Sequence, residues 1–437
     1  TAPGLITRVI GGLGSDVVNV GGDVVGSVFA QDVEGSSGAI NHLVTSADTR
    51  YNGKVIDGID LSVARPTQGM VIVTESAGFT AVTEGGGVDS YIVSLVRPSD
   101  KDVYVTVSAA RSQYEERKAG ADSLWVSEDA GVFLRSFTVH YVQGPQPTTV
   151  PQHAIVLHFK AGETAKTVYV KAPTDGVAEG DRKVVISHSV ISADATFDDA
   201  RVRNVEAQVY DIDQPAIQLI AVDPATGLAD GQSIVLEGGA GTGISDQYRV
   251  HLAIPPAAGT TVTVDITVGD PRVVLSGDPA RFSTVTPRTA TTPGVYRVTF
   301  GPADASDVLV TMTAVDDFVA QDPRTTVLTH SVNATLTTDA RYDDATTGAK
   351  PESLYVKVRD NDSAGVLVVP SNGSTLVNAS DPAQTDSYTM RLTTAPTADV
   401  NIAILGDGQT DVVLGGRVQL AAVGTPLNGL FTGAVSW

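Results

Sequence analysis

The stretch Val184–Ala200 reads VVISHSVISADATFDDA, and its central phrase returns twice along the chain. His188-Ser189-Val190 recurs as His330-Ser331-Val332 in TVLTHSVNATLTTDARYDDA and as His42-Leu43-Val44 in AINHLVTSADTRYNG. The three histidines lie 146 residues (42 to 188) and 142 residues (188 to 330) apart. A repeat of this length predicts a tandem array in which each copy folds in the same way.

A second phrase keeps the same order but falls at a different point of the repeat. It reads Asp89-Ser90-Tyr91, then Asp246-Gln247-Tyr248, then Asp386-Ser387-Tyr388. Two phrases in constant order divide the 437 residues into units. We expect the back part of one unit in residues 1–65, complete units in 66–214 and 215–362, and the front part of a further unit in 363–437.

The secondary structure is expected to be β almost throughout. Val and Thr are frequent, only 5% of residues are aromatic, and 43 Gly with 22 Pro supply turns. Apolar and polar residues alternate, as in half-buried strands, in Asp102–Ala109, Lys166–Ala172, Thr261–Val268, Asp307–Val315 and Ser353–Arg359. One charged segment, Ser112–Gly120, fits either a short helix or a loop. Short strands separated by turn residues favour antiparallel sandwiches over an α/β enzyme fold.

Composition excludes several classes of function. The net charge of −21 opposes binding to nucleic acid and to anionic membrane surfaces. No apolar run approaches the roughly 18 residues that a membrane-spanning helix needs. The chain has no cysteine, so it has neither disulfides nor thiol chemistry. A bound metal is one alternative source of stability for a secreted domain.

Acidic residues gather at strand ends in both complete units. In residues 66–214 the positions are Glu84, Asp175, Glu179, Asp211 and Asp213. In residues 215–362 they are Glu237, Asp316, Asp317, Asp360 and Asp362. Strand ends that are distant in sequence meet at one pole of a sandwich, where several carboxylates repel one another unless a cation lies among them. Calcium takes six to eight oxygen ligands and fits such a pole; plain acidic turns on a soluble surface are the alternative.

Four motifs of the first complete unit together resemble the Calx-β family, first described in sodium–calcium exchangers and common in large bacterial surface proteins. They are VTEGG (82–86), HFKAGETAKTVYV (158–170), AEGD (178–181) and DID (211–213). The resemblance implies tandem immunoglobulin-like sandwiches, and it implies Ca²⁺ bound by the ten acidic residues just named. Because junctions such as Gln214-Pro215 are short, we expect the units to form a rod.

Departures from the family pattern put some sites in doubt. Gln321 stands where the first complete unit has Glu179, and Pro323 stands where it has Asp181. The unit in residues 1–65 ends without an acidic pair, and Asn378 replaces the glutamate of the unit in residues 363–437. We therefore expect calcium sites in the two complete units.

The recurrent histidines are expected to be structural. His42, His188 and His330 are each followed by an aspartate and an aromatic residue, which suggests a corner held by hydrogen bonds from histidine to loop backbone. The sequence contains no nucleophile elbow, phosphate loop or zinc motif. Because the acidic constellations recur in each complete unit, they do not indicate a single active site, and we expect no enzyme within this chain.

The leading functional hypothesis is a calcium-stiffened structural or adhesive segment of a large extracellular or cell-surface protein. Its expected partners are calcium, copies of itself, and other surface proteins or glycans. One alternative is a head-to-tail filament in which the partial units at the two ends complete each other between molecules. Two further alternatives are a spacer region of a secreted enzyme and a calcium sensor.

Overall fold

The computed structural model describes most of the chain from Ser36 onward. The described residues are 36–64, 69–110, 123–141, 144–200, 202–238, 243–342, 351, 353–371, 375–378, 385–406, 410, 412, 418–419 and 431–436. The charged segment Ser112–Gly120, predicted as a helix or loop, lies outside them. The described residues form antiparallel β-sandwiches with short 3₁₀ turns η2 (Ser76–Gly78) and η3 (Ala340–Tyr342), so the all-β fold class is confirmed.

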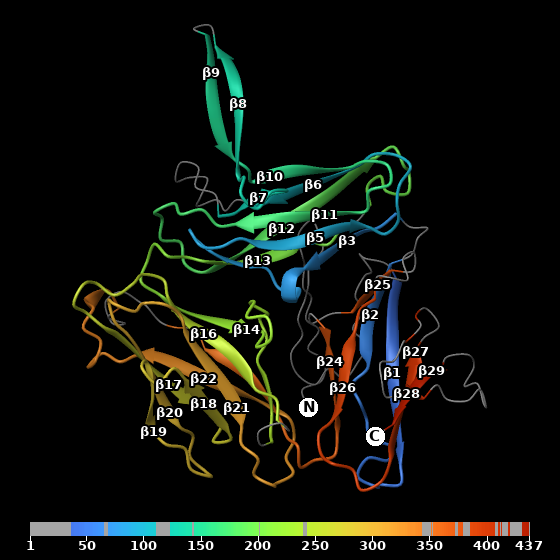
Figure 1. Cartoon of the computed structure of the whole chain (residues 1–437), viewed down its shortest axis with the longest axis vertical. Helices are drawn as coiled ribbons and strands as arrows, with labels where there is room; N and C mark the ends of the chain where they lie inside the picture. Colours follow the sequence, from blue (N-terminus) through green and yellow to red (C-terminus); the bar gives the residue numbers. More distant parts are fainter. Residues whose placement is uncertain are drawn as a thin grey trace, which may run out of the picture.

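The first sandwich is built from one five-stranded and one four-stranded sheet. Their strand orders are β10–β6–β12–β13–β4 and β3–β5–β11–β7. The strands are β3 (Val71–Glu75), β4 (Ala81–Thr83), β5 (Asp89–Leu95), β6 (Val103–Ala109), β7 (Trp125–Ser127), β10 (Ala154–Phe159), β11 (Ala165–Lys171), β12 (Arg182–Ser192) and β13 (Val205–Tyr210). A separate hairpin of β8 (Leu134–Tyr141) and β9 (Gly144–Pro151) projects away from the sandwich (Figure 1).

The second sandwich repeats this plan. Its sheets have the orders β15–β23–β22–β17–β20–β19 and β14–β16–β21–β18. The strands are β14 (Ile217–Val222), β15 (Ile234–Leu236), β16 (Asp246–Leu252), β17 (Val262–Val268), β18 (Val273–Gly277), β19 (Phe282–Thr286), β20 (Val295–Phe300), β21 (Val308–Ala314), β22 (Arg324–Val332) and β23 (Leu354–Arg359). The five strands expected from alternation are confirmed as β6, β11, β17, β21 and β23, with ends that differ by one residue.

The third sandwich, called the end sandwich below, joins both ends of the described chain. Its larger sheet has the order β25–β2–β1–β27–β29–β28, and its smaller sheet contains β24 and β26. The strands are β1 (Ser36–Ser46), β2 (Ile59–Ala64), β24 (Val366–Pro370), β25 (Leu376–Asn378), β26 (Tyr388–Leu392), β27 (Val400–Gly406), β28 (Val418–Gln419) and β29 (Phe431–Ser436). The larger sheet matches the larger sheet of the second sandwich strand for strand. The two partial units predicted at the ends therefore complete each other within one chain.

The three sandwiches do not lie in a line. In Figure 1 the first sandwich lies above the other two, which stand side by side. The amide of Asn378 donates to the carbonyl oxygen of Val96 at 2.9 Å and joins the end sandwich to the first. Gln218 of the second sandwich donates to Asp181 of the first at 2.7 Å. The rod expected from the short junctions is thus not what the structure shows, and the predicted unit boundaries stay a prediction.

Alternating side chains fill each core. In β6, Val103, Val105 and Val107 are fully buried, whereas Tyr104 is exposed. Burying a valine side chain stabilises the fold by roughly 1.5–3 kcal/mol. The alternation of apolar and polar residues in the sequence therefore places apolar side chains on the core face of each sheet and polar ones on the other face.

The two repeated phrases meet across the sandwich. Tyr91 and His188 contact through the phenol oxygen and Nε2 at 2.9 Å, and Tyr248 and His330 do so at 3.0 Å. His188 Nδ1 also lies 3.0 Å from the carbonyl oxygen of Arg203, which confirms the expected bond to loop backbone. In the end sandwich His42 makes both kinds of contact, to Tyr388 at 3.2 Å and to the Asp57 carbonyl at 2.8 Å. The histidines are thus structural links between the two sheets.

Candidate metal centres

Parallel strand pairing gathers the acidic residues at one pole of each complete sandwich. β4 and β13 run parallel with Thr83 opposite Tyr210, so Glu84 and Asp211 both follow at the same end. The backbone nitrogen of Gly85 donates to the Ala172 carbonyl at 3.1 Å, which brings the loop after β11 to this end. The second sandwich repeats the arrangement with β15 parallel to β23.

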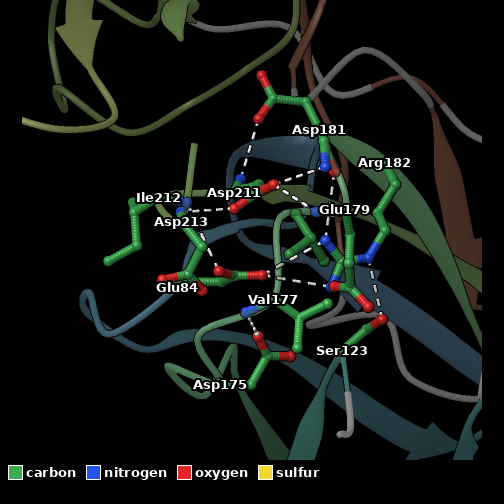
Figure 2. A network of polar contacts seen from close by, with 12 residues as sticks. Glu84, Ser123, Asp175, Val177, Glu179, Asp181, Arg182, Asp211, Ile212 and Asp213 are labelled. Carbon is green, nitrogen blue, oxygen red and sulfur yellow. Dashed lines mark hydrogen bonds and ion pairs between the residues drawn. The ribbon is translucent and has the colours of Figure 1, made fainter. Parts of the chain in front are cut away.

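The first candidate site combines three of the five predicted residues. Carboxylate oxygens of Glu84, Asp175 and Asp213 all lie within 4.8 Å of one another. Glu84 is only 2% exposed, although it carries a carboxylate. Figure 2 shows that these side chains come from three separate segments of the chain. One ion of suitable size could bind all three carboxylates.

The other two predicted residues of this site have neighbouring roles. Asp211 is fully buried, and its Oδ2 accepts hydrogen bonds from the backbone nitrogens of Glu179 and Gly180 at 2.7 and 2.5 Å. Asp211 Oδ1 accepts another from the nitrogen of Asp213 at 2.7 Å. Asp211 therefore shapes the two loops, while the Glu179 carboxylate forms an ion pair with Arg182.

Arg182 is a component that the sequence analysis missed. Its guanidinium lies 3.3 Å from Glu84 Oε1, and its Nε donates to Ser123 Oγ at 3.0 Å (Figure 2). It directly follows the Glu-Gly-Asp motif, but nothing in that motif marks the arginine as part of the cluster. The positive charge of Arg182 thus neutralises part of the negative charge of the acidic residues at this pole.

The second candidate site has the same plan with different details. Carboxylate oxygens of Glu237, Asp360 and Asp362 lie within 4.8 Å of one another. Asp360 accepts from the nitrogen of Asp362 at 2.7 Å and from Ser363 Oγ at 2.9 Å. The predicted Asp317 accepts hydrogen bonds from the backbone nitrogen of Val319 at 2.9 Å and from the side-chain amide of Gln321 at 2.8 Å.

Arg272 provides the internal positive charge of the second site, and it was also missed. Its Nη1 donates to Glu237 Oε1 at 2.7 Å, and Asp270 binds the same guanidinium at 3.0 Å. This arginine precedes β18, whereas Arg182 begins β12. Aligning the two units pairs Arg182 with Arg324, which begins β22 and contacts Asp270 at 2.9 Å, so the alignment does not point to Arg272.

Both buried glutamates have raised pKa values. Burial, reinforced by the charges of Asp211 and Asp175, raises the pKa of Glu84 from its usual 4.5 to about 8. Burial, reinforced by Asp317 and Asp360, raises the pKa of Glu237 to about 7 against the opposing effect of Arg272. Each pole therefore has more negative charge than its arginine neutralises. The excess charge favours binding of either a proton or a metal cation.

Unpaired oxygens test whether a metal ion fits. Among the described residues, four buried carboxylate oxygens have no hydrogen-bond partner: Asp175 Oδ2, Glu237 Oε2, Asp316 Oδ1 and Asp362 Oδ2. A buried acceptor without a donor is costly, and a coordinated cation satisfies it. Every side chain in the two clusters offers oxygen alone, the ligand type that calcium and magnesium prefer. The residues thus fit a hard divalent cation.

The second site opens onto a cleft beside the end sandwich. The cleft has a volume of about 560 Å³ and is lined by residues of both sandwiches, among them Asp316, Asp362 and Arg391. At the equivalent pole of the end sandwich, Asn378 occupies the glutamate position and binds Val96 instead.

Comparisons with known proteins found similarity among solved structures. No family model matches the sequence, and no curated protein matches it either. The CBD12 structure from CALX1.2 has 11% identity and a TM-score of 0.24, covering 65% of this chain and 98% of that one. The calcium binding domain CBD12 of CALX1.1 has 12% identity and a TM-score of 0.23, covering 66% and 99%.

A chaperone–tip adhesion subunit complex of Csu pili from Acinetobacter baumannii is also similar, with 7% identity and a TM-score of 0.18, covering 67% of this chain and 99% of that one. Likeness at this level does not show the family, so the sandwich fold rests on the strand order itself. In the described residues, no helix has the length and apolar character required to cross a membrane.

Proposed function

We propose that this chain is a calcium-stiffened structural or adhesive segment of a secreted or cell-surface protein. The observation that carries the proposal is the recurrence of the three-carboxylate cluster at the same pole of the first and second sandwiches. Surface proteins or glycans are the proposed partners. An active site is expected once, whereas a stabilising ion is expected in every unit that keeps its ligands.

Each residue of the proposed sites has a distinct role. Glu84, Asp175 and Asp213 would hold the first ion, and Glu237, Asp360 and Asp362 the second. The first ion would supply a positive charge that joins the loops after β4, β11 and β13, and the second would join those after β15 and β23. Asp211 positions two of these loops through backbone hydrogen bonds. Extracellular calcium modules bind at about 10⁻⁴–10⁻³ M, and an ion at a hundredfold excess over Kd stabilises a fold by about 2.7 kcal/mol.

The first site also adjoins the junction between sandwiches. Gln218 is only 2% exposed and donates to the carbonyl oxygen of Asp211 at 2.8 Å and to Asp181 at 2.7 Å. An ion that fixes the loop of Asp211 and Asp213 therefore also fixes the surface on which the second sandwich rests. Stiffening of the junction follows from the same binding event.

Thermal unfolding of the full chain tests the proposal. We expect the midpoint to be higher in about 2 mM calcium, above the usual range of such sites, than in chelator. The rise should disappear when Asp213→Asn and Asp362→Asn are combined. Asp100→Asn is the matched control, since this exposed aspartate pairs only with Lys101 at 3.6 Å in the described structure. Equal calcium responses in the double variant and the wild type would refute the site assignment.

A second candidate function is a subunit of a head-to-tail filament. It is favoured by the pairing of β1 with β27 over seven residue pairs, from Ile40–Gly406 to Ser46–Val400. The same pairing between two molecules would make a contact that does not close, which generates a filament. Sedimentation over a wide concentration range should then give multiples of 45.2 kDa, and Ile402→Asp should suppress them. A single monomeric species at every concentration would exclude the filament.

A further inference from the structure

The larger sheet of the second sandwich carries a hydroxyl-rich segment at one side. Residues 283–292 (STVTPRTATT) form most of β19 and the start of the loop before β20. β19 is the last strand on its side of the sheet and lies at the periphery of the molecule in Figure 1. In the described part of the first sandwich, the larger sheet has no strand beyond β10, the counterpart of β20. The hydroxyl groups belong to Ser283, Thr284, Thr286, Thr289, Thr291 and Thr292.

These side chains are exposed on both faces of the strand. Phe282 is buried, whereas every later residue of β19 is exposed. Successive side chains of a strand point to opposite faces, so this end of β19 extends past the core with solvent on both sides. Thr289, Thr291 and Thr292 in the loop are exposed as well. An enzyme can therefore reach the hydroxyls without unfolding the sandwich.

Two contacts hold the backbone of the segment in place. The ring of Phe282 stacks on that of Tyr296 with centroids 5.7 Å apart. Arg288 Nε donates to the carbonyl oxygen of Pro271 at 2.6 Å. The segment also contains two Thr-Pro steps, at 286–287 and 292–293, and a residue before proline is restricted to extended backbone. The exposed hydroxyls thus lie on an ordered, extended stretch of chain.

The fold does not use most of these hydroxyls. Thr289 Oγ1 accepts hydrogen bonds from the backbone nitrogens of Thr291 and Thr292, at 3.3 and 2.9 Å. In the described structure the side-chain hydroxyls of the other five residues make no hydrogen bond within the chain. They are therefore available for chemical modification.

A second threonine-rich stretch of the same sandwich is different. In residues 334–339 (ATLTTD), Thr337 Oγ1 donates to the carbonyl oxygen of Thr263 at 3.3 Å. Thr338 Oγ1 accepts from the backbone nitrogen of Thr261 at 2.8 Å. These two hydroxyls hold a loop in place, so threonine content alone does not distinguish the two stretches, whereas the hydrogen bonds do.

We propose that the exposed hydroxyls of residues 283–292 are acceptors for O-glycosylation. The Oγ1 atom of a threonine would form a bond to the anomeric carbon of a nucleotide-activated sugar. The bond from that carbon to the phosphate oxygen breaks, the nucleoside diphosphate leaves, and the hydroxyl proton passes to a base of the glycosyltransferase. Segments rich in serine, threonine and proline are typical of O-glycosylated proteins.

Peptide mass mapping of the full chain, isolated from the cells that produce it, tests the proposal. Trypsin cleaves after Arg281, Arg288 and Arg297, so the six hydroxyls divide between peptides 282–288 and 289–297. We expect both peptides to carry sugar that mild alkaline elimination releases. Fragmentation that keeps the sugar attached should place it on the hydroxyls that make no hydrogen bond.

The control lies in the same digest. Cleavage after Arg324 and Arg341 gives peptide 325–341, which contains Thr337 and Thr338. Because both hydroxyls are engaged in the folded loop, we expect no sugar on them. Sugar on peptide 282–288 or 289–297, and none on Thr337 or Thr338, supports the proposal. Absence of sugar from both peptides, or equal occupancy at Thr337 and Thr338, would overturn it.

Discussion

At the scale of single residues, the buried carboxylates are the central feature of the molecule. Glu84 and Glu237 are at most 2% exposed, and each faces an arginine and two aspartates of its own sandwich. Without a metal ion, the negative charge of each glutamate lowers the stability of the fold at neutral pH. With a metal ion, each glutamate would act as a ligand. A substitution at Glu84 should therefore have opposite effects under the two conditions.

We predict that Glu84→Gln stabilises the chain in chelator at pH 8 and destabilises it in calcium. The folded pKa of about 8 lies above the usual 4.5, so without calcium the wild type loses stability as pH rises between these values. Glutamine carries no such charge, and its advantage should grow over this pH range. In calcium the variant lacks one ligand.

Denaturant unfolding at pH 5 and pH 8, in chelator and in calcium, measures both effects. Asp100→Asn is again the control at an exposed aspartate. A variant that is less stable than the wild type in chelator at pH 8 would contradict the account.

The convergence of the acidic residues could be predicted from the sequence, whereas their arginine partners could not. Glu84, Asp211 and their counterparts follow repeated motifs, so their convergence could be inferred from strand order alone. Arg182 and Arg272 reach the poles from different strands, which only the three-dimensional packing determines. Which of the five acids face a common point also depends on backbone hydrogen bonds, such as those that bind Asp211.

The tyrosine–histidine links give a second prediction at this scale. Tyr248→Phe should lower the free energy of unfolding by about 1–3 kcal/mol, because it leaves the buried Nε2 of His330 without its partner. Denaturant unfolding of the full chain in chelator measures the loss. Tyr355→Phe in the same sandwich is the control, since Tyr355 is 65% exposed. Equal losses in the two variants would rule out a structural role for the link.

At the scale of elements, parallel pairing at one edge of each larger sheet determines where the sites form. β4 with β13 and β15 with β23 place the ends of distant strands side by side. The same pairing of β25 with β2 in the end sandwich brings Asn378 beside Ala64. Strand order thus creates the pole in all three sandwiches, and the residue types decide whether it has carboxylates.

The projecting hairpin was not predicted as strands, because VQGPQPTTVP reads as a Gly/Pro-rich loop. The prolines of β9 are Pro145, Pro147 and Pro151. They are separated by even numbers of residues, so their backbone nitrogens face the same side of the strand. Proline cannot donate to a ladder, so these backbone nitrogens belong on the outer side, away from β8. That outer edge is therefore protected against pairing with a further strand.

We predict that replacing residues 136–149 by a short Gly/Asn turn leaves the stability of the first sandwich unchanged. In the described topology β8 and β9 pair with each other and belong to neither sheet of the sandwich. The thermal midpoint in calcium should shift by no more than about 2 °C, within the range of a surface change for chains of this size. A large decrease would mean that the hairpin contributes to the core.

At the scale of the whole molecule, the end sandwich should be the least stable part. Its strands β1 and β27 are paired across most of the chain length, and its described core residues fall into two separate clusters. The first and second sandwiches each have one large continuous core. Closing a long stretch of chain costs conformational entropy, and a divided core favours local opening.

Hydrogen exchange tests this ranking. Amides of β1 and β27 should exchange faster than those of the equivalent pairs, β12 with β6 and β22 with β17. Equal protection in all three sandwiches would contradict it. The closure of the two chain ends onto each other could be proposed from the incomplete repeats, but whether it occurs within one molecule depends on the folded arrangement.

Calorimetric titration of the full chain with calcium tests the central claim most directly. We expect the wild-type chain to bind two ions, one at each of the two acidic clusters. Asp213→Asn should bind one ion, and the double variant with Asp362→Asn should bind none. Calcium binding that is unchanged in the double variant, or no binding by the wild type at millimolar calcium, would contradict the claim.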